Sequence, residues 1–150
     1  MKDYIIQRVV FKGENESHST EYRDTFNEAK QRMLSIAAAD ANDSNTTYAL
    51  AMILNREGQS YKCEIYDVRD VREQFYILVR YFEKNGKMSH STQYYFYDPD
   101  HPRKYYLDAE QRWFNIIAAD LLDPDVTFNG AVLINAYDGS IVENRAFGRD

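Results

Sequence analysis

The feature that most constrains the fold is an internal repeat. The tetrapeptide SHST occurs at residues 17–20 and again at residues 89–92. At the same spacing of 72 residues, the run YIIQR that begins at Tyr4 aligns with the run YILVR that begins at Tyr76. Histidine is rare here, with 3 in 150 residues, so a shared tetrapeptide that contains it is not expected by chance. The two tetrapeptides therefore indicate a longer duplication.

The alignment continues beyond the tetrapeptides, but its spacing grows to 80 residues. Residues 26–40 align with residues 106–120, and both segments end in Ala-Ala-Asp. The change in spacing reflects an insertion in the second copy, which includes residues 98–104. Only two copies are present, so a long solenoid is excluded. The sequence predicts two units, at residues 1–70 and 71–150.

Each copy has the pattern of two strands, a helix and two further strands. Apolar, β-branched runs bounded by turn residues are typical of strands. Thr25 and Glu28 form a capping box that predicts a helix start, and Pro124 predicts a helix end because proline cannot donate a backbone amide. In the first copy we expect strands at residues 4–12, 17–23, 46–54 and 61–66 and a helix at residues 26–40. In the second copy we expect strands at residues 74–82, 89–97, 127–135 and 140–146 and a helix at residues 107–122, with Ala109, Trp113, Ile116, Ile117 and Leu121 facing inward.

This ββαββ pattern predicts an α+β fold. A four-stranded antiparallel sheet with a helix on one face forms a two-layer arrangement. Two such units in one chain most simply form a pseudo-dimeric sheet and helix domain. The units could join edge strands into one longer sheet or pack their helices face to face, and the sequence does not choose between these arrangements.

Composition excludes several classes of protein. The net charge is −6, which argues against direct binding of nucleic acid because such binding needs a basic surface. Cys63 is the single cysteine, so neither an intramolecular disulfide nor a cysteine-based metal site is expected. No stretch approaches the roughly 18 apolar residues of a membrane span, and no signal segment is recognisable. These features predict a soluble, cytoplasmic protein without a cofactor.

His18 and His90, the histidines of the two SHST tetrapeptides, suggest a nucleophile and base pair at first sight. Neighbouring residues in a strand point to opposite faces, however, so neither histidine can pair with its adjacent serine. The chain also lacks a Gly-x-Ser-x-Gly motif that would expose a nucleophilic serine. We interpret SHST as a trace of duplication. A small hydrolase that uses either histidine remains an alternative, which alanine substitution of both would test.

The insertion in the second copy is the strongest candidate for a binding site. It contains Asp98-Pro99-Asp100-His101-Pro102-Arg103 and is flanked by aromatic residues. Aromatic rings and arginine are typical of protein-binding hot spots, so we expect Tyr95, Tyr97, His101, Arg103 and Tyr105 to anchor a partner. Two alternatives remain: a metal bound by the carboxylates and histidine, and a purely structural role in which Tyr94 and Phe96 pack the hairpin against its helix while Tyr95 and Tyr97 face the other side.

Acidic residues gather near the predicted helix ends. Asp120, Asp123 and Asp125 lie around the end of the second helix, which is the unfavourable end of the helix dipole for an acid. Solvated caps and turns are one explanation. The other is a surface that complements a basic partner, and we include these three residues in the predicted partner-binding site.

The repeated unit resembles a known group of proteins. A strand, a polar strand, a helix that starts near Asp-Ala and a final hairpin are matched by residues 75–86 and 107–139. This pattern resembles small uncharacterised ββαββ proteins of phages and mobile elements of Gram-positive bacteria. The resemblance implies a mobile-element product in a bacterial cytoplasm, and it implies no particular activity.

Together these features predict a non-catalytic binding protein. One hypothesis is that it inhibits a host defence nuclease, as anti-CRISPR proteins do, by blocking a basic nucleic-acid-binding surface through shape and charge. A nucleotide sponge and a virion accessory protein are the alternatives. The sequence also leaves open whether the chain forms a homodimer.

Overall fold

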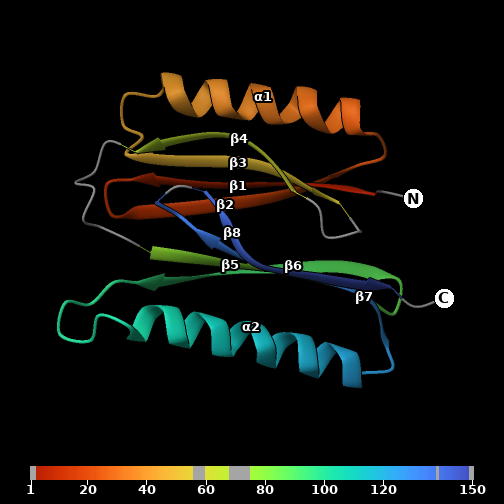
Figure 1. The fold of residues 1–150 in the computed structure, drawn as a ribbon. Coiled ribbons are helices and arrows are strands. Elements are labelled where there is room, and N and C mark those ends of the chain that lie inside the picture. The colour runs from red at the N-terminus through yellow and green to blue at the C-terminus, as the bar shows by residue number, and fades with distance from the viewer. Residues whose placement is uncertain (1–2, 56–59, 68–74, 138, 149–150) are drawn as a thin grey trace. The chain divides into compact units, whose positions relative to one another are not determined.

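The computed structural model describes residues 3–55, 60–67, 75–137 and 139–148 (Figure 1). The chain divides into two compact units, Met1–Asp70 and Val71–Asp150. Over the described residues it is an α+β protein with two antiparallel sheets and two helices, which confirms the predicted class. The predicted turn at residues 55–58, the predicted join at residues 67–72, Asp138 and the side chain of Cys63 lie wholly or partly outside the described residues.

The first unit contains one four-stranded sheet and one helix. Its sheet has the strand order β2-β1-β3-β4, and each neighbouring pair is antiparallel. The hairpin β1–β2 therefore leaves β1 in the centre, where it also pairs with β3. The elements are β1 (Tyr4–Lys12), β2 (Asn15–Arg23), α1 (Phe26–Asn42), β3 (Tyr48–Asn55) and β4 (Ser60–Asp67).

The second unit contains the other sheet and helix, in the strand order β6-β5-β7-β8. Asn85 and Gly86 join β5 to β6, and both have positive φ, at 53° and 77°. Positive φ at both central residues is the mark of a type I′ turn, which matches the twist of a hairpin. The elements are β5 (Phe75–Lys84), β6 (Lys87–Phe96), α2 (Lys104–Leu122), β7 (Val126–Asn135) and β8 (Ile141–Gly148).

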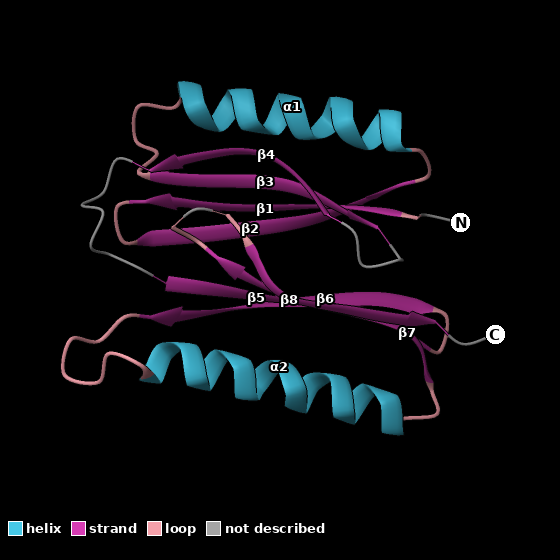
Figure 2. Cartoon of the chain, in the orientation of Figure 1, coloured by secondary structure: helices cyan, strands magenta, loops and turns pink. Residues whose placement is uncertain are grey.

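Each helix lies along one face of its own sheet (Figure 2). Under α1, the core cluster consists of Ile6, Ala29, Met33, Ile36, Ala37, Ala51 and Ile53. Under α2, the cluster consists of Leu78, Ala109, Trp113, Ile116, Ile117, Ala131 and Leu133. The indole of Trp113 also donates a hydrogen bond of 2.9 Å to the carbonyl oxygen of Ala131. This bond fixes the largest core side chain of α2 against β7.

The structure differs from the expected layout in its sheets. The prediction combined both copies in one sheet and helix domain, with joined edge strands as one arrangement. Among the described residues, strand pairing instead stays within each unit and gives two four-stranded sheets. Each central strand, such as β1 or β5, already pairs on both sides with strands of its own unit. Among the described residues, the edge strands β2, β4, β6 and β8 each pair with one neighbour of their own unit.

The second helix also differs from its prediction. It begins at Lys104 rather than at Leu107. The rings of Tyr105 and Tyr106 both pack on Tyr76, with ring centroids 5.0 Å and 5.5 Å away, and this packing accounts for the additional first turn. Leu121, predicted to face inward, is exposed.

Candidate functional site

The insertion forms an ordered turn between β6 and α2. The Asp98 side chain accepts a hydrogen bond of 3.0 Å from the backbone amide of Asp100, and it contacts the His101 ring at 3.3 Å. The backbone amide of His101 donates to the carbonyl of Asp98, and that of Lys104 donates to the carbonyl of His101. The amide of Asp100, and next His101, lower the pKa of Asp98. Asp98 therefore acts as the carboxylate that closes the turn, as an Asp-Pro step favours.

Aromatic rings surround this turn. Tyr97 meets Tyr105 edge to face at a centroid distance of 5.5 Å, and Tyr105 in turn packs on Tyr76. The hydroxyl of Tyr95 donates to the side-chain oxygen of Gln93 at 2.9 Å. Burial raises the pKa of Tyr95, so its hydroxyl remains protonated and able to donate.

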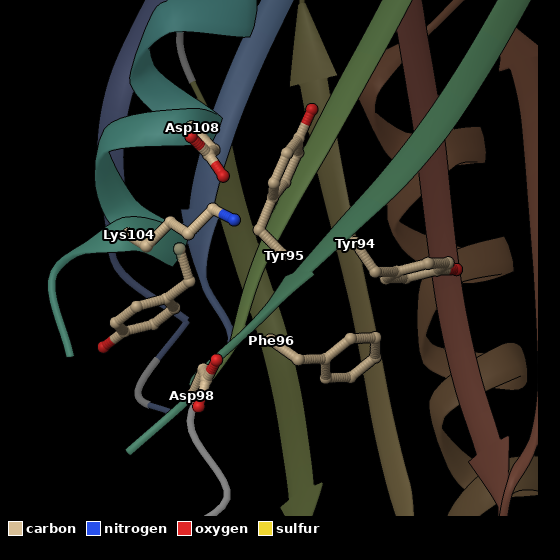
Figure 3. Close-up of a pocket in the computed structure, with 7 residues that line it drawn as sticks. Tyr94, Tyr95, Phe96, Asp98, Lys104 and Asp108 are labelled. Carbon is tan, nitrogen blue, oxygen red and sulfur yellow. The ribbon is translucent and has the colours of Figure 1, made fainter. Parts of the chain in front are cut away.

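A pocket of about 270 Å³ opens where β6 meets the start of α2 (Figure 3). Figure 3 shows Tyr95 beside Lys104 and Asp108, while Tyr94 and Phe96 point to the other side of the strand. The pocket is lined by Tyr94, Tyr95, Phe96, Asp98, Lys104, Tyr105 and Asp108. A second, open hollow of about 490 Å³ adjoins the turn and is lined by Asp100, His101, Pro102, Arg103, Lys104, Leu107 and Asp108.

The structural alternative for the insertion expected Tyr94 and Phe96 to face the helix and Tyr95 to face away from it. The structure shows the reverse. Tyr95 packs at the edge of the core under α2, so it faces the helix. Phe96 stacks on Phe75 from the opposite face, with centroids 5.2 Å apart. The register pairs Tyr95 with Tyr76 across the two strands, and Tyr76 is itself covered by the first turn of α2. The longer start of α2 therefore makes Tyr95 a packing residue.

The remaining predicted anchors of the insertion are accessible. Tyr97, His101 and Arg103 are exposed, and Tyr105 is half-buried. Arg103 occupies the N-cap position of α2, and its side chain makes no capping hydrogen bond. The structure thus presents two rings, an imidazole and a guanidinium around one turn.

The acidic residues lie at the other end of α2. The helix has 19 residues, which corresponds to about 28 Å. Asp120 is buried, with 3% exposure, and binds Arg80 through two hydrogen bonds of 2.6 Å and 3.0 Å. It also accepts a short hydrogen bond from the side-chain amide of Asn129. Asp120 therefore has an internal partner, and its placement on a protein-binding surface does not fit the structure.

The other two acids are accessible to different degrees. Asp123 is half-buried and forms an ion pair of 2.9 Å with Lys84, and its other oxygen accepts from the amide of Asp125. Asp125 is exposed. The structure therefore does not join the acids to the insertion in one site.

Two equivalent ion pairs, one in each unit, were not predicted from the sequence. In the first unit, Arg8 binds Asp40 through hydrogen bonds of 2.7 Å and 2.8 Å, which raises the pKa of Arg8. Arg80 and Asp120 make the same bidentate contact in the second unit. The signal was present, because the two arginines align at a spacing of 72 and the two aspartates at a spacing of 80. Charged residues repeated on the inward face of a helix are rarely buried unless they are paired.

The histidines of the SHST tetrapeptides lie on the outer strands β2 and β6. His18 is opposite Val9 and His90 is opposite Tyr81, and both histidines are exposed. The part of the chain that the structure describes contains no group of three or more His, Cys, Asp or Glu side chains that could hold a metal ion. No described helix is long and apolar enough to cross a membrane.

Comparison with known proteins gives no further assignment. No protein-family model, curated protein or solved structure shows a significant match to the chain.

Proposed function

We propose that this chain is a non-catalytic binding protein that binds a protein partner at the start of α2. The proposed contact, here called the insertion surface, consists of Tyr97, His101, Arg103 and Tyr105. The observation that carries the proposal is the ordered turn that presents these side chains together. Tyrosine and arginine are the residue types that contribute most at protein interfaces.

The order of the turn supports this role. The Asp98 carboxylate and two backbone hydrogen bonds hold residues 98–104 in one conformation. A surface that is ordered before binding loses less conformational entropy when it binds. The edge-to-face contact between Tyr97 and Tyr105 restricts both rings for the same reason.

The charge of the chain favours a basic partner. The net charge is −6, and the exposed Asp100 and Asp108 lie beside the insertion surface. Acidic groups around an aromatic anchor would attract a basic protein and accelerate association. As part of the proposal, the partner is a host defence nuclease whose nucleic-acid-binding surface becomes blocked, and the chain is a mobile-element product in a bacterial cytoplasm.

We further infer that the two units descend from one ββαββ ancestor and form a pseudo-dimer. The support is that aligned residues make matching contacts. Besides the arginine and aspartate pairs, Lys12 pairs with Asp43 at 2.7 Å and Lys84 pairs with Asp123 at 2.9 Å. Shared internal contacts at aligned positions are what a duplication leaves behind.

Affinity purification tests the proposed binding site. The bait carries Tyr97→Ala and Arg103→Ala together, and the matched control carries Tyr137→Ala, which removes an exposed ring elsewhere in the same unit. Partners are quantified by mass spectrometry. We expect the double variant to lose a partner that wild type and Tyr137→Ala retain. Equal recovery with the double variant would show that the partner binds elsewhere.

A further inference from the structure

A polar groove lies between β2 and α1 in the first unit, with a volume of about 230 Å³. Its charged residues are paired with each other. Arg8 binds Asp40. The Nε of Arg32 donates to both carboxylate oxygens of Glu21, at 3.0 Å and 3.2 Å. The lining residues are Arg8, Ser19, Glu21, Arg32, Ser35, Ile36, Ala39 and Asp40.

The second unit repeats most of these residues on β5, β6 and α2. Six of the eight are identical at the aligned positions. The two differences are Gln93 in place of Glu21 and an asparagine in place of Ser35. The aligned residues are Arg80, Ser91, Gln93, Arg112, Asn115, Ile116, Ala119 and Asp120. The second unit has therefore kept the arginine that binds Glu21 in the first unit and has lost the carboxylate.

This change leaves Arg112 without an internal acid. Arg112 is exposed, and no described side chain forms a hydrogen bond or an ion pair with its guanidinium. The acid of this groove, Asp120, is already bound by Arg80 and Asn129. The charges that line the first groove cancel, whereas those of the second leave one positive charge without a counterpart.

Two further acids of α2 lie near Arg112 in sequence but make other contacts. Asp108 lies one turn earlier, a common position for an ion pair, but it lines the hollows beside the insertion instead. Glu110 accepts a hydrogen bond of 2.7 Å from the hydroxyl of Tyr106. Burial raises the pKa of Tyr95, and the charge of Arg112 opposes this rise. Arg112 therefore lies near the side chains of β6.

The two changed residues add hydrogen-bond donors to the groove. A side-chain amide has an oxygen that accepts and a nitrogen that donates. The oxygen of Gln93 accepts from the Tyr95 hydroxyl at 2.9 Å, and the oxygen of Asn115 accepts from the side chain of Gln111 at 3.0 Å. Each contact leaves the amide nitrogen to donate. Where the first unit has a carboxylate, the second has donors beside a guanidinium.

We propose that the groove between β6 and α2 binds a small molecule that carries a carboxylate. The ligand takes the place that the Glu21 carboxylate has in the first unit, with Arg112 as its counter-ion and Gln93 and Asn115 as donors. Hydrogen bonds between a guanidinium and a carboxylate are stronger than those between neutral groups. Because Arg112 is exposed, binding is weak and falls as salt is added.

A ¹⁵N NMR titration of the full chain with propionate tests the site, because propionate matches the end of a glutamate side chain. Sodium chloride at equal ionic strength is the control. We expect saturable shifts of the Arg112 Nε–H and the Gln93 side-chain amide, while the Arg32 Nε–H stays unchanged because Glu21 already occupies it. Shifts no larger than those in chloride, or equal shifts of both arginines, would overturn the site. Inorganic phosphate is the second probe, and tighter binding of phosphate would overturn the ligand class.

Two nearly isosteric substitutions exchange the properties of the grooves. Gln93→Glu supplies an internal carboxylate and should weaken propionate binding at Arg112 by more than about tenfold. Glu21→Gln empties the first groove and should add a second propionate site, seen as a new shift of Arg32. Tyr137→Glu is the matched control, because it adds the same charge at an exposed position of the second unit, and it should change neither groove. Unaltered binding in Gln93→Glu, or no second site in a folded Glu21→Gln, would overturn the proposal.

These outcomes are independent of the proposed partner, because the groove contains no residue of the insertion surface. The double variant with Tyr97→Ala and Arg103→Ala should keep the propionate shifts while it loses the partner. Arg112→Gln should lose the shifts and keep the partner. Loss of both properties in either variant would contradict the independence of the two sites.

Discussion

The two units share their internal contacts and differ at the start of the helix. Asp24 and Thr25 connect β2 to α1, whereas residues 97–103 connect β6 to α2. The Thr25 hydroxyl accepts a hydrogen bond of 3.2 Å from the amide of Glu28 and caps α1. Arg103 occupies the same position before α2 and caps nothing with its side chain. The first unit uses this region to cap its helix, whereas in the second unit we propose that it binds a partner.

A second difference lies beside the shared arginine and aspartate pairs. Asn129 donates to Asp120 in the second unit, while Ala49 occupies the aligned position in the first. Among the described residues, the Asp120 carboxylate accepts hydrogen bonds from two side chains, Arg80 and Asn129, whereas the Asp40 carboxylate accepts its two from Arg8. We therefore expect the stability of the second unit to depend more strongly on this carboxylate.

The largest expected effect comes from removing these aspartates. Asp120→Ala leaves Arg80 and Asn129 without their acceptor, so we expect a loss of roughly 3–4 kcal/mol in the free energy of unfolding. Asp40→Ala removes the acceptor of Arg8 alone, so the loss in the free energy of unfolding should be about 1 kcal/mol smaller. Urea denaturation of both variants measures the two losses. Equal losses would show that Asn129 contributes nothing at this site.

The next effect concerns one cross-strand pair. In the second unit it combines a large side chain with a glycine, and in the first unit it combines two side chains of intermediate size. Tyr81 faces Gly130 across β5 and β7, whereas Val9 faces Leu50 at the aligned place across β1 and β3. A Cβ atom on Gly130 would lie 2.0 Å from the Tyr81 ring. Gly130→Ala should therefore destabilise the protein by roughly 2–3 kcal/mol through overpacking.

A double substitution that copies the residues of the first unit provides the control for this prediction. Tyr81→Val combined with Gly130→Leu copies the pair of the first unit, and it should recover most of the stability that Gly130→Ala loses. Thermal and urea unfolding of the single and double variants give the coupling between the two sites. A tolerated Gly130→Ala would mean that the Tyr81 ring moves aside without cost.

A smaller effect is expected at the helix starts. Thr25→Ala removes the cap of α1 and should cost about 1 kcal/mol. Arg103→Ala removes no capping bond and should leave stability within about 0.5 kcal/mol. The comparison can be made by urea denaturation. A similar loss in both variants would contradict the view that only the first unit uses this position for stability.

The smallest effect depends on pH. Glu21 binds Arg32, which lowers the pKa of Glu21, whereas Gln93 occupies the aligned position in the second unit. A lowered pKa adds stability above the unfolded value of about 4.3, and that stability is lost as pH falls through the folded pKa. Glu21→Gln should thus cost roughly 0.5 kcal/mol at neutral pH after solvent screening. Urea denaturation at several pH values measures the difference in the free energy of unfolding between Glu21→Gln and wild type. This difference should vanish in acid, and a difference that stays constant across pH would contradict the proposed role of Glu21.

Local patterns in the sequence predicted most elements of each unit. The limits of β1 at Tyr4–Lys12 and the start of α1 at Phe26 are confirmed, because strand runs, turn residues and the capping box act over a few residues. The extension of α2 to Lys104 was missed, since it depends on packing of its tyrosines against Tyr76. No local pattern shows such a contact.

The candidate site was predicted less completely than the fold. Position in the insertion identified Tyr97, His101 and Arg103 as exposed, but it did not reveal that Tyr95 packs toward the helix. The sequence suggests grouping the acids with the insertion because both would suit a basic partner, although a whole helix separates them in the structure. The sequence alone does not show that Asp120 is buried, because its partner, Arg80, lies on a strand 40 residues away in the chain.

The central claim is that residues added to the second unit bind the partner, while the shared scaffold supplies stability. Replacing residues 97–105 with a single threonine tests it most directly, because Thr-Tyr-Leu-Asp then copies Thr25-Phe26-Asn27-Glu28 of the first unit. Co-purification is compared with wild type by quantitative mass spectrometry, with unfolding measured in parallel. We predict that stability stays within about 1 kcal/mol of wild type and that the captured partner is lost. A folded variant that retains the same partner in equal amount would contradict the claim.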